Sequence, residues 1–255
     1  MREKKMRCIM KRLVSYILTI CCLAGTVVSS QALTVETEEA VMVSSSANLS
    51  LMQLEEDLQN KETLHIQEIQ NLKDIYTISS DTLNEEYCVY YLKPKEPLKR
   101  MVYSDGSAIN EYASRAVLTR TKEDVDGSLA VVMWSEMTYE TKQFVDGGGN
   151  HTGYRIVKSS ALIKSFDERF GRNFGTRCIQ VGENLVTNQI ERFDSSHRWG
   201  DRIVGRTQSY NPGFSGYMAC DFNGSISTDV YVDISHNGST YWTFNIHLSE
   251  GTIPL

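Results

Sequence analysis

The residues best suited to binding chemistry lie in the stretch 166–206. Every basic side chain there except His197 is an arginine, and four phenylalanines and Trp199 lie between them. An arginine fork matches carboxylate or phosphate oxygens, and a tryptophan offers a flat face to a sugar ring or a cation. The densest part, DSSHRWGDRIVGR, therefore predicts a ligand-binding site made of His197, Arg198, Trp199 and Arg202.

A structural role is the alternative for the same stretch. Trp199 would then plug the end of a β-sandwich, and the arginines would pair with nearby carboxylates or dock the acidic N-terminal region. A buried Trp199 with a bonded indole N–H favours packing, whereas an open groove beside Arg198 and Arg202 favours a site.

A Ser-His-Asp set can be assembled from Ser215, one of two histidines (His151, His197) and one of two aspartates (Asp194, Asp201). Such chemistry needs a serine activated by an imidazole that a carboxylate holds in place. The segment PGFSGY lacks the strand–elbow–helix context of the hydrolase motif. We therefore predict no catalytic residue, and a secreted hydrolase with an unrecognised site remains an alternative.

The run FVDGGGNHTGYRI, residues 144–156, could be a phosphate loop, a calcium loop or a hairpin tip. A phosphate loop leads into a helix, but the residues that follow are strand-like. Calcium needs several spaced oxygen ligands, and neither this run nor KEDVDGSL at 122–129 supplies a full set. The histidines show no zinc spacing. We expect a hairpin tip here, and neither a metal nor a cofactor.

The N-terminus has the three parts of a secretory signal peptide. Residues to Arg12 are basic, an apolar run extends from Leu13 to about Val28, and small residues at Ser30 and Ala32 suit cleavage after Ala32. We therefore expect a signal peptide over 1–32, a secreted and bacterial protein, and no stable membrane span after cleavage.

Charge separates two regions of the expected mature chain. Residues 33–255 carry 20 basic and 31 acidic side chains, a net charge of −11. Residues 33–86 account for −10 of this and residues 87–255 for −1. A nucleic-acid partner is disfavoured because phosphate binding relies on clustered positive charge.

Three cysteines remain after the expected cleavage. Cys178 and Cys220 lie in apparent strands of the same region, so a disulfide between them is our preferred pairing in an oxidising compartment. The alternative is three reduced thiols, those two and Cys88, that behave as small buried hydrophobes.

The acidic region divides into a linker and a helical segment. Residues 33–48 are acidic and serine-rich, which is typical of a flexible linker. Residues 49–86 contain two apolar stripes at helical spacing, interrupted at Lys61 and His65. We expect one broken or two short amphipathic helices, the first burying Leu51, Leu54 and Leu58.

Residues 87–255 predict an all-β antiparallel sandwich or open barrel. Six runs rich in aromatic and β-branched residues are separated by turn residues, without a helix-length segment between them. Alternation in the run from Leu129 to Glu140 predicts one dry face and one face in water. The dry face would contain Met133, Met137 and Tyr139, and the wet face Glu136, Thr138 and Glu140.

The last hairpin should have a defined register. The apolar residues of the two strands share a face if a three-residue loop, His236-Asn237-Gly238, connects them. A two-residue Asn237-Gly238 turn would place them on opposite faces. We therefore predict that Val232 pairs with Trp242.

These patterns favour a non-catalytic extracellular binding or interaction module. Its ligand would be a carbohydrate, a peptide or an anionic group. A toxin or bacteriocin-like effector with an acidic pro-segment is a further alternative, which proteolytic processing near residues 78–86 would support.

Overall fold

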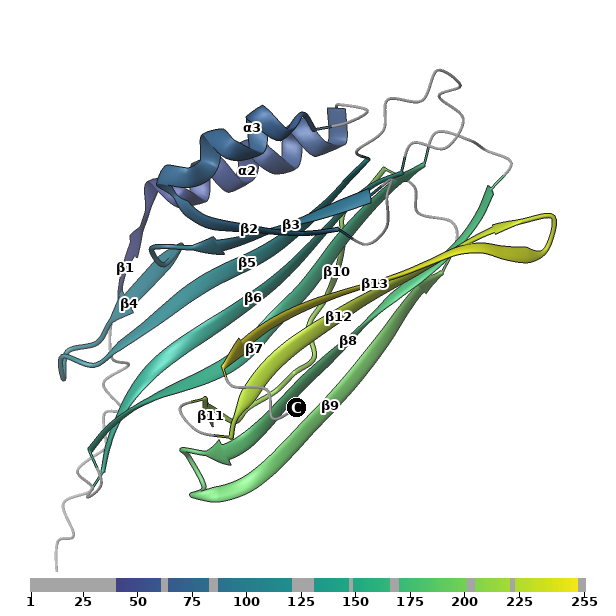
Figure 1. The fold of residues 1–255 in the computed structure, drawn as a ribbon. Coiled ribbons are helices and arrows are strands. Elements are labelled where there is room, and N and C mark those ends of the chain that lie inside the picture. The colour runs from purple at the N-terminus through teal and green to yellow at the C-terminus, as the bar shows by residue number, and fades with distance from the viewer. Residues whose placement is uncertain are drawn as a thin grey trace, which may run out of the picture. The chain divides into compact units, whose positions relative to one another are not determined.

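The computed structural model describes residues 40–60, 64–82, 87–120, 131–146, 149–165, 170–200, 205–220 and 223–251. The expected signal peptide at 1–32 lies outside these ranges. The described chain is mostly antiparallel β-sheet with two helices, which confirms the all-β fold (Figure 1). The elements are β1 (Val41–Ser44), α2 (Ser46–Asn60), α3 (Ile66–Gln70), the 3₁₀ helix η1 (Asn71–Asp74), β2 (Tyr76–Thr82), β3 (Tyr87–Pro94), β4 (Lys99–Val102), β5 (Ala108–Arg120), β6 (Val131–Asp146), β7 (Gly149–Ser165), β8 (Phe170–Asn184), β9 (Gln189–Gly200), β10 (Gln208–Tyr210), β11 (Met218–Ala219), β12 (Ser225–His236) and β13 (Ser239–Gly251).

The strands form two layers joined at one corner. In the first layer β5 pairs with β6 and β6 with β7, while β3 and β4 share the other edge of β5 and carry β2 and β1. The second layer has the order β9-β8-β12-β13. The short strand β11 connects the layers, because Met218 pairs with Tyr154 of β7 and Asn184 of β8. Hydrogen bonds thus join the thirteen strands of the described residues into one sheet.

The main hydrophobic core lies between the two layers. Strands β3, β5, β6 and β7 contribute one wall, and β8, β12 and β13 contribute the other. Its members include Leu118, Met133, Met137, Ile156, Phe174, Val230, Val232, Phe244 and Ile246. The predicted dry face of β6 is therefore confirmed.

A second core lies beneath α2 and α3, which cover the other face of the first layer. The predicted helical stripe of Leu51, Leu54 and Leu58 is buried there against Trp134 and Leu162 of the sheet. Because both faces of the first layer are covered, the predicted wet face of β6 is wrong. Glu136, Thr138 and Glu140 are all buried.

Two strands lie where the sequence suggested other structure. β1 falls within the expected linker at 33–48 and pairs with β4, with Val43 opposite Arg100. β2 falls within the expected helical segment at 49–86 and pairs with β3, with Ile78 opposite Leu92. Both are short, and hydrogen bonds to a distant partner strand decide their conformation, which a local pattern does not record.

The last hairpin corrects the predicted register. Asn237 and Gly238 form a two-residue turn with φ of 51° and 78°, as a type I′ turn requires. A bulge follows, because Ser235 pairs with Thr240 while Ile234 pairs with Trp242. Val232 therefore pairs with Phe244 rather than Trp242. The extra residue of the bulge places the apolar residues of the two strands on the same face of the sheet. The predicted three-residue loop would have had the same effect.

The glycine run belongs to a hairpin, as expected. β6 and β7 pair along their length as far as Asp146 and Gly149, and Phe144 lies opposite His151. No helix follows the run, since β7 begins at Gly149.

The three cysteines in the described part of the chain are buried, and no disulfide joins any two of them. The hydroxyl of Thr228 donates to Cys178 Sγ (3.8 Å), whereas Cys220 Sγ donates to the carbonyl of Met218 (3.7 Å). Burial raises the pKa of the Cys178 thiol to about 11. The preferred disulfide is thus not formed in this structure, and the alternative of buried thiols describes it.

No helix in the described residues is long and apolar enough to span a membrane.

The packing of α2 makes a stability prediction. Leu58 is 0% exposed whereas Met52, on the same helix, is 65% exposed. We expect Leu58→Ala to lower the free energy of unfolding by about 2–5 kcal/mol, because truncation removes buried surface and leaves a cavity. Met52→Ala is the matched control, with an expected change within about 0.5 kcal/mol. Equal effects in urea unfolding would contradict this docking of α2.

Candidate functional site

The predicted site residues lie on β9, which pairs with β8 alone among the described strands. Side chains alternate along a strand, so His197 and Arg198 point to opposite faces. A bulge follows, in which Gly175 pairs with Arg198 and Phe174 with Gly200, leaving Trp199 as the extra residue. The bulge lets the Trp199 ring pack on Phe174, at a centroid distance of 5.2 Å.

The inner face of β9 packs against the segment around β10. His197 stacks on Tyr210 with ring centroids 5.0 Å apart, and Ser195 forms a hydrogen bond to the Tyr210 hydroxyl. Phe193 contacts Phe214 further along (5.7 Å). Since β10 also pairs with β7, this segment closes one side of the space between the layers.

The four predicted residues therefore do not form one surface. His197 and Trp199 are neighbours at 6.1 Å, but His197 is exposed whereas Trp199 is half-buried and packs against the core. The Trp199 indole nitrogen is buried without a hydrogen-bond partner among the described residues. Trp199 therefore matches neither alternative fully, because it does not line an open groove and its buried N–H is not bonded. Arg198 is exposed on the opposite face, and Arg202 lies outside the described residues.

On the outer face of the second layer, Arg198 lies in a row with an aromatic and an amide side chain. Arg198, Gly175, Tyr231 and Asn245 occupy one row across the four strands. A Cβ at Gly175 would lie 2.4 Å from the Tyr231 hydroxyl oxygen, so the absence of a side chain lets this phenol lie across β8. No local sequence pattern predicts this arrangement, because Gly175 and Tyr231 are far apart in the chain.

The neighbouring charges on this face are paired. Arg177 donates through Nε to Asp194 (2.9 Å), and Arg192 lies 3.4 Å from the same carboxylate. Hydrogen bonding from Arg177 is the main cause that lowers the pKa of Asp194. Arg198, by contrast, has no ion-pair partner within the part of the chain that the structure describes.

At the far side of the face, Asp229 pairs with His247. The carboxylate oxygen lies 2.7 Å from the imidazole Nδ1. This hydrogen bond outweighs the partial burial of the ring and raises the pKa of His247 above its ordinary value of 6.5. The pair crosses from β12 to β13 directly, since Asp229 and His247 are cross-strand partners.

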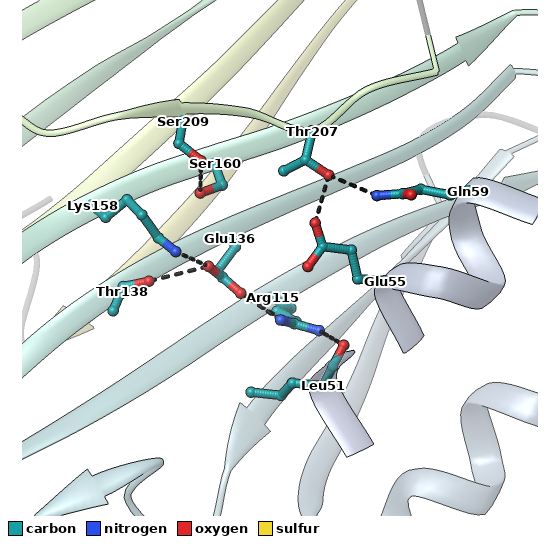
Figure 2. A network of polar contacts seen from close by, with 10 residues as sticks. All are labelled: Leu51, Glu55, Gln59, Arg115, Glu136, Thr138, Lys158, Ser160, Thr207 and Ser209. Atoms are coloured by element: carbon teal, nitrogen blue, oxygen red, sulfur yellow. Dashed lines mark hydrogen bonds and ion pairs between the residues drawn. The ribbon is translucent and has the colours of Figure 1, made fainter. Parts of the chain in front are cut away.

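A buried charge cluster lies on the first layer beneath α2 (Figure 2). Arg115 of β5 donates through Nε to Glu136 of β6 (2.9 Å), and Arg115 is only 3% exposed. Lys158 and Thr138 approach the other carboxylate oxygen at 3.3 Å and 3.1 Å. Burial alone would raise the pKa of Glu136, but these charges and hydrogen bonds hold it below its ordinary value.

The cluster also anchors the helix. Arg115 donates to the main-chain carbonyl of Leu51 in α2 (3.2 Å) and lies 5.0 Å from the centroid of the Trp134 ring. Thr207 donates to Glu55 of α2 (2.7 Å), which ties the segment before β10 to the same helix. The charged groups of Arg115 and Glu136 are bound to partners within the fold, which supports a role for the cluster in packing.

The sequence contains one signal for this cluster. Arg115 and Glu136 each interrupt an apolar run, in SRAVL and WSEM, at positions expected to form strands. Charges on two neighbouring strands pair when one face is covered. Recognising the pair required knowing that helices cover this face.

The catalytic set built from Asp194 and His197 is ruled out by geometry. Asp194 lies on the outer face of β9, bound to two arginines, whereas His197 lies on the inner face against Tyr210. Asp201 lies outside the described residues. Within those residues, no group of three or more potential metal ligands occurs.

Comparison with known proteins finds no relative. No family model, no curated protein and no solved structure matches the chain.

The buried ion pair makes a second stability prediction. Arg115→Met leaves Glu136 as a buried, incompletely compensated carboxylate, and we expect a loss of about 3–5 kcal/mol. Replacing both residues, Arg115→Met with Glu136→Leu, should recover most of that loss because no charge remains buried. Chemical denaturation measures both. A single variant as stable as the wild type would show that the pair is not buried in solution.

The Asp229–His247 pair predicts a pH dependence. Because the folded pKa of His247 is raised, its contribution to stability is present below about pH 6.5 and is lost as pH rises through the folded value. NMR titration of the His247 ring should show a pKa above 6.5, and Asp229→Asn should lower it towards that value. Identical midpoints for His247 in both proteins would contradict the pair.

Proposed function

We propose that the chain is a secreted, non-catalytic binding module whose second layer presents an anion-binding face. The observation that carries this proposal is the exposed Arg198, unpaired among the described residues and aligned with the Tyr231 phenol across Gly175. Two arginines nearby are paired with Asp194, whereas the guanidinium of Arg198 has no such partner among the described residues and could bind a ligand.

The chemistry of the row favours a carboxylate, sulfate or phosphate group. A guanidinium donates two parallel hydrogen bonds to such an anion, and a phenol hydroxyl donates a further one. The row also contains Asn245, which is exposed and offers an amide donor. Local hydrogen bonding must provide the affinity, because the expected mature chain is net negative and repels anions at long range.

Secretion and architecture are part of the same proposal. The basic and apolar N-terminal segment supports an extracellular location. For the fold we favour the open barrel over a sandwich of separate sheets, because β11 links the layers by hydrogen bonds. β1 and β2 belong to the first layer, which supports an acidic region that stays with the module instead of leaving as a pro-segment.

The test is a titration with inorganic sulfate and with a heparin tetrasaccharide as a multivalent anion, followed by NMR and calorimetry. Arg198→Ala should weaken binding about 10-fold or more, because a charged hydrogen bond is lost. Binding should weaken with added salt, since exposed charges are screened.

Arg206→Ala is the matched control. Arg206 is exposed in the segment before β10 and lies outside the row of Arg198. It should leave the affinity within about twofold. Equal losses for the two variants would indicate a diffuse charge effect, and the absence of anion binding by the wild type would reject the proposed site.

A further inference from the structure

A surface hollow of about 550 Å³ lies between α3 with the 3₁₀ helix η1 on one side and strands β2 and β3 of the first layer on the other. It is separate from the row of Arg198, which is on the second layer. Amide, hydroxyl and phenol groups dominate its lining, from Gln67, Gln70, Asn71, Ser79, Ser80 and Tyr90. Its volume is within the range of pockets for small molecules.

The amides gather on one face of the helix. Gln67, Gln70 and Asn71 are related by three and four residues, which places them side by side. The other face of the helix is held by the core, since Ile69 is fully buried and Leu72 packs against the same cluster. The amides are therefore directed away from the core by the packing of their neighbours.

The helix is also fixed at both ends. At its start the main-chain N–H of His65 donates to the Glu68 carboxylate (3.1 Å), and the N–H of Glu68 donates back to the His65 carbonyl (2.9 Å). At its end Lys95 donates through Nζ to the carbonyl of Lys73 (2.7 Å). A helix held in this way presents its side chains with little reorganisation, which lowers the entropic cost of binding a ligand.

The sheet supplies an aromatic wall. Ser80 and Tyr90 are cross-strand partners on β2 and β3, and Ile78 lies two residues before Ser80 on the same face. Tyr90 and Ile78 are half-buried and pack against the cluster beneath the helices. A tyrosine ring held on one side in this manner can offer its remaining surface to the apolar face of a sugar ring.

The charge of the lining is unusual for its region. Residues 33–86 have a net charge of −10, yet the described residues that line the hollow include no carboxylate and one ammonium, that of Lys73. This lining favours a neutral ligand over a divalent cation, because hard cations prefer carboxylate oxygens. Each amide offers a carbonyl acceptor and two N–H donors, which match adjacent hydroxyls of a polyol.

We propose that this hollow binds a neutral saccharide. One sugar ring stacks on Tyr90, and its hydroxyls exchange hydrogen bonds with Gln67, Gln70 and Asn71 on one side and with Ser80 on the other. The proposal is independent of the anion-binding face, because the two sites share no residue.

The experiment is a titration of the whole protein with four neutral probes, namely cellotetraose, maltotetraose, mannotetraose and chitotetraose, observed by NMR and calorimetry. At least one should bind with a Kd in the range of about 0.1–10 mM and shift the resonances of Gln67, Gln70 and Asn71. Gln70→Ala should weaken that binding about 3- to 10-fold, and Tyr90→Ala at least 10-fold. Tyr90→Phe, which keeps the ring, should stay within about threefold.

Two controls separate recognition from folding. Gln53→Ala removes an exposed amide from α2, outside the hollow, and should leave saccharide binding unchanged. Gln67→Ala with Gln70→Ala changes only exposed side chains, so it tests the site even if Tyr90→Ala unfolds. Arg198→Ala should bind saccharide normally, which distinguishes this site from the anion-binding face. The proposal is overturned if none of the four probes binds at 10 mM, or if the double variant binds like the wild type.

Discussion

The ion pair between Arg115 and Glu136 is the contact on which the position of the helical layer depends. Arg115 binds the carboxylate on β6, the carbonyl of Leu51 in α2 and the face of Trp134 at once. A buried guanidinium left without these partners would cost several kcal/mol, so α2 is held where its carbonyl meets the charge. The second helix follows in the chain and places Ile69 in the same core. The helix that forms one wall of the hollow beside Tyr90 therefore packs on the same core that Arg115 borders through Trp134.

Double coverage of the first layer explains where the sequence could and could not predict the fold. Alternation along β6 identified the strand and the face that holds Met133 and Met137. The same alternation suggested that Glu136 faces water, although it is buried. Periodicity separates two faces but does not reveal what covers each of them. The leucine stripe of α2 indicates what covers this face. Such a stripe packs on an apolar surface, and Trp134 and Leu162 provide one on an otherwise polar face of the sheet.

The candidate site was limited by strand geometry in a similar way. Composition selected the β9 stretch, and the structure does bring His197 and Trp199 together. It separates Arg198 from them because neighbours on a strand point to opposite faces. The bulge at Trp199 and the bulge after the last turn each add one residue to a ladder, which changes the face or partner of everything beyond. Short-range patterns contain no record of such insertions, whereas cross-strand packing determines them.

The edge strands β1 and β9 differ in how they avoid pairing with a further strand, and on β9 the same arginine that prevents pairing could also bind a ligand. β1 exposes Val41, Met42 and Val43 at an edge, but it is only four residues long and offers few hydrogen bonds to another strand. β9 has twelve residues, and its outward positions hold Arg192, Asp194 and Arg198. Charges on a long edge disfavour pairing with a further strand. Asp229 and His247, on β12 and on the opposite edge strand β13, pair with each other. Arg198 has no ion-pair partner among the described residues, so this protecting arginine is the one that the proposed anion could bind.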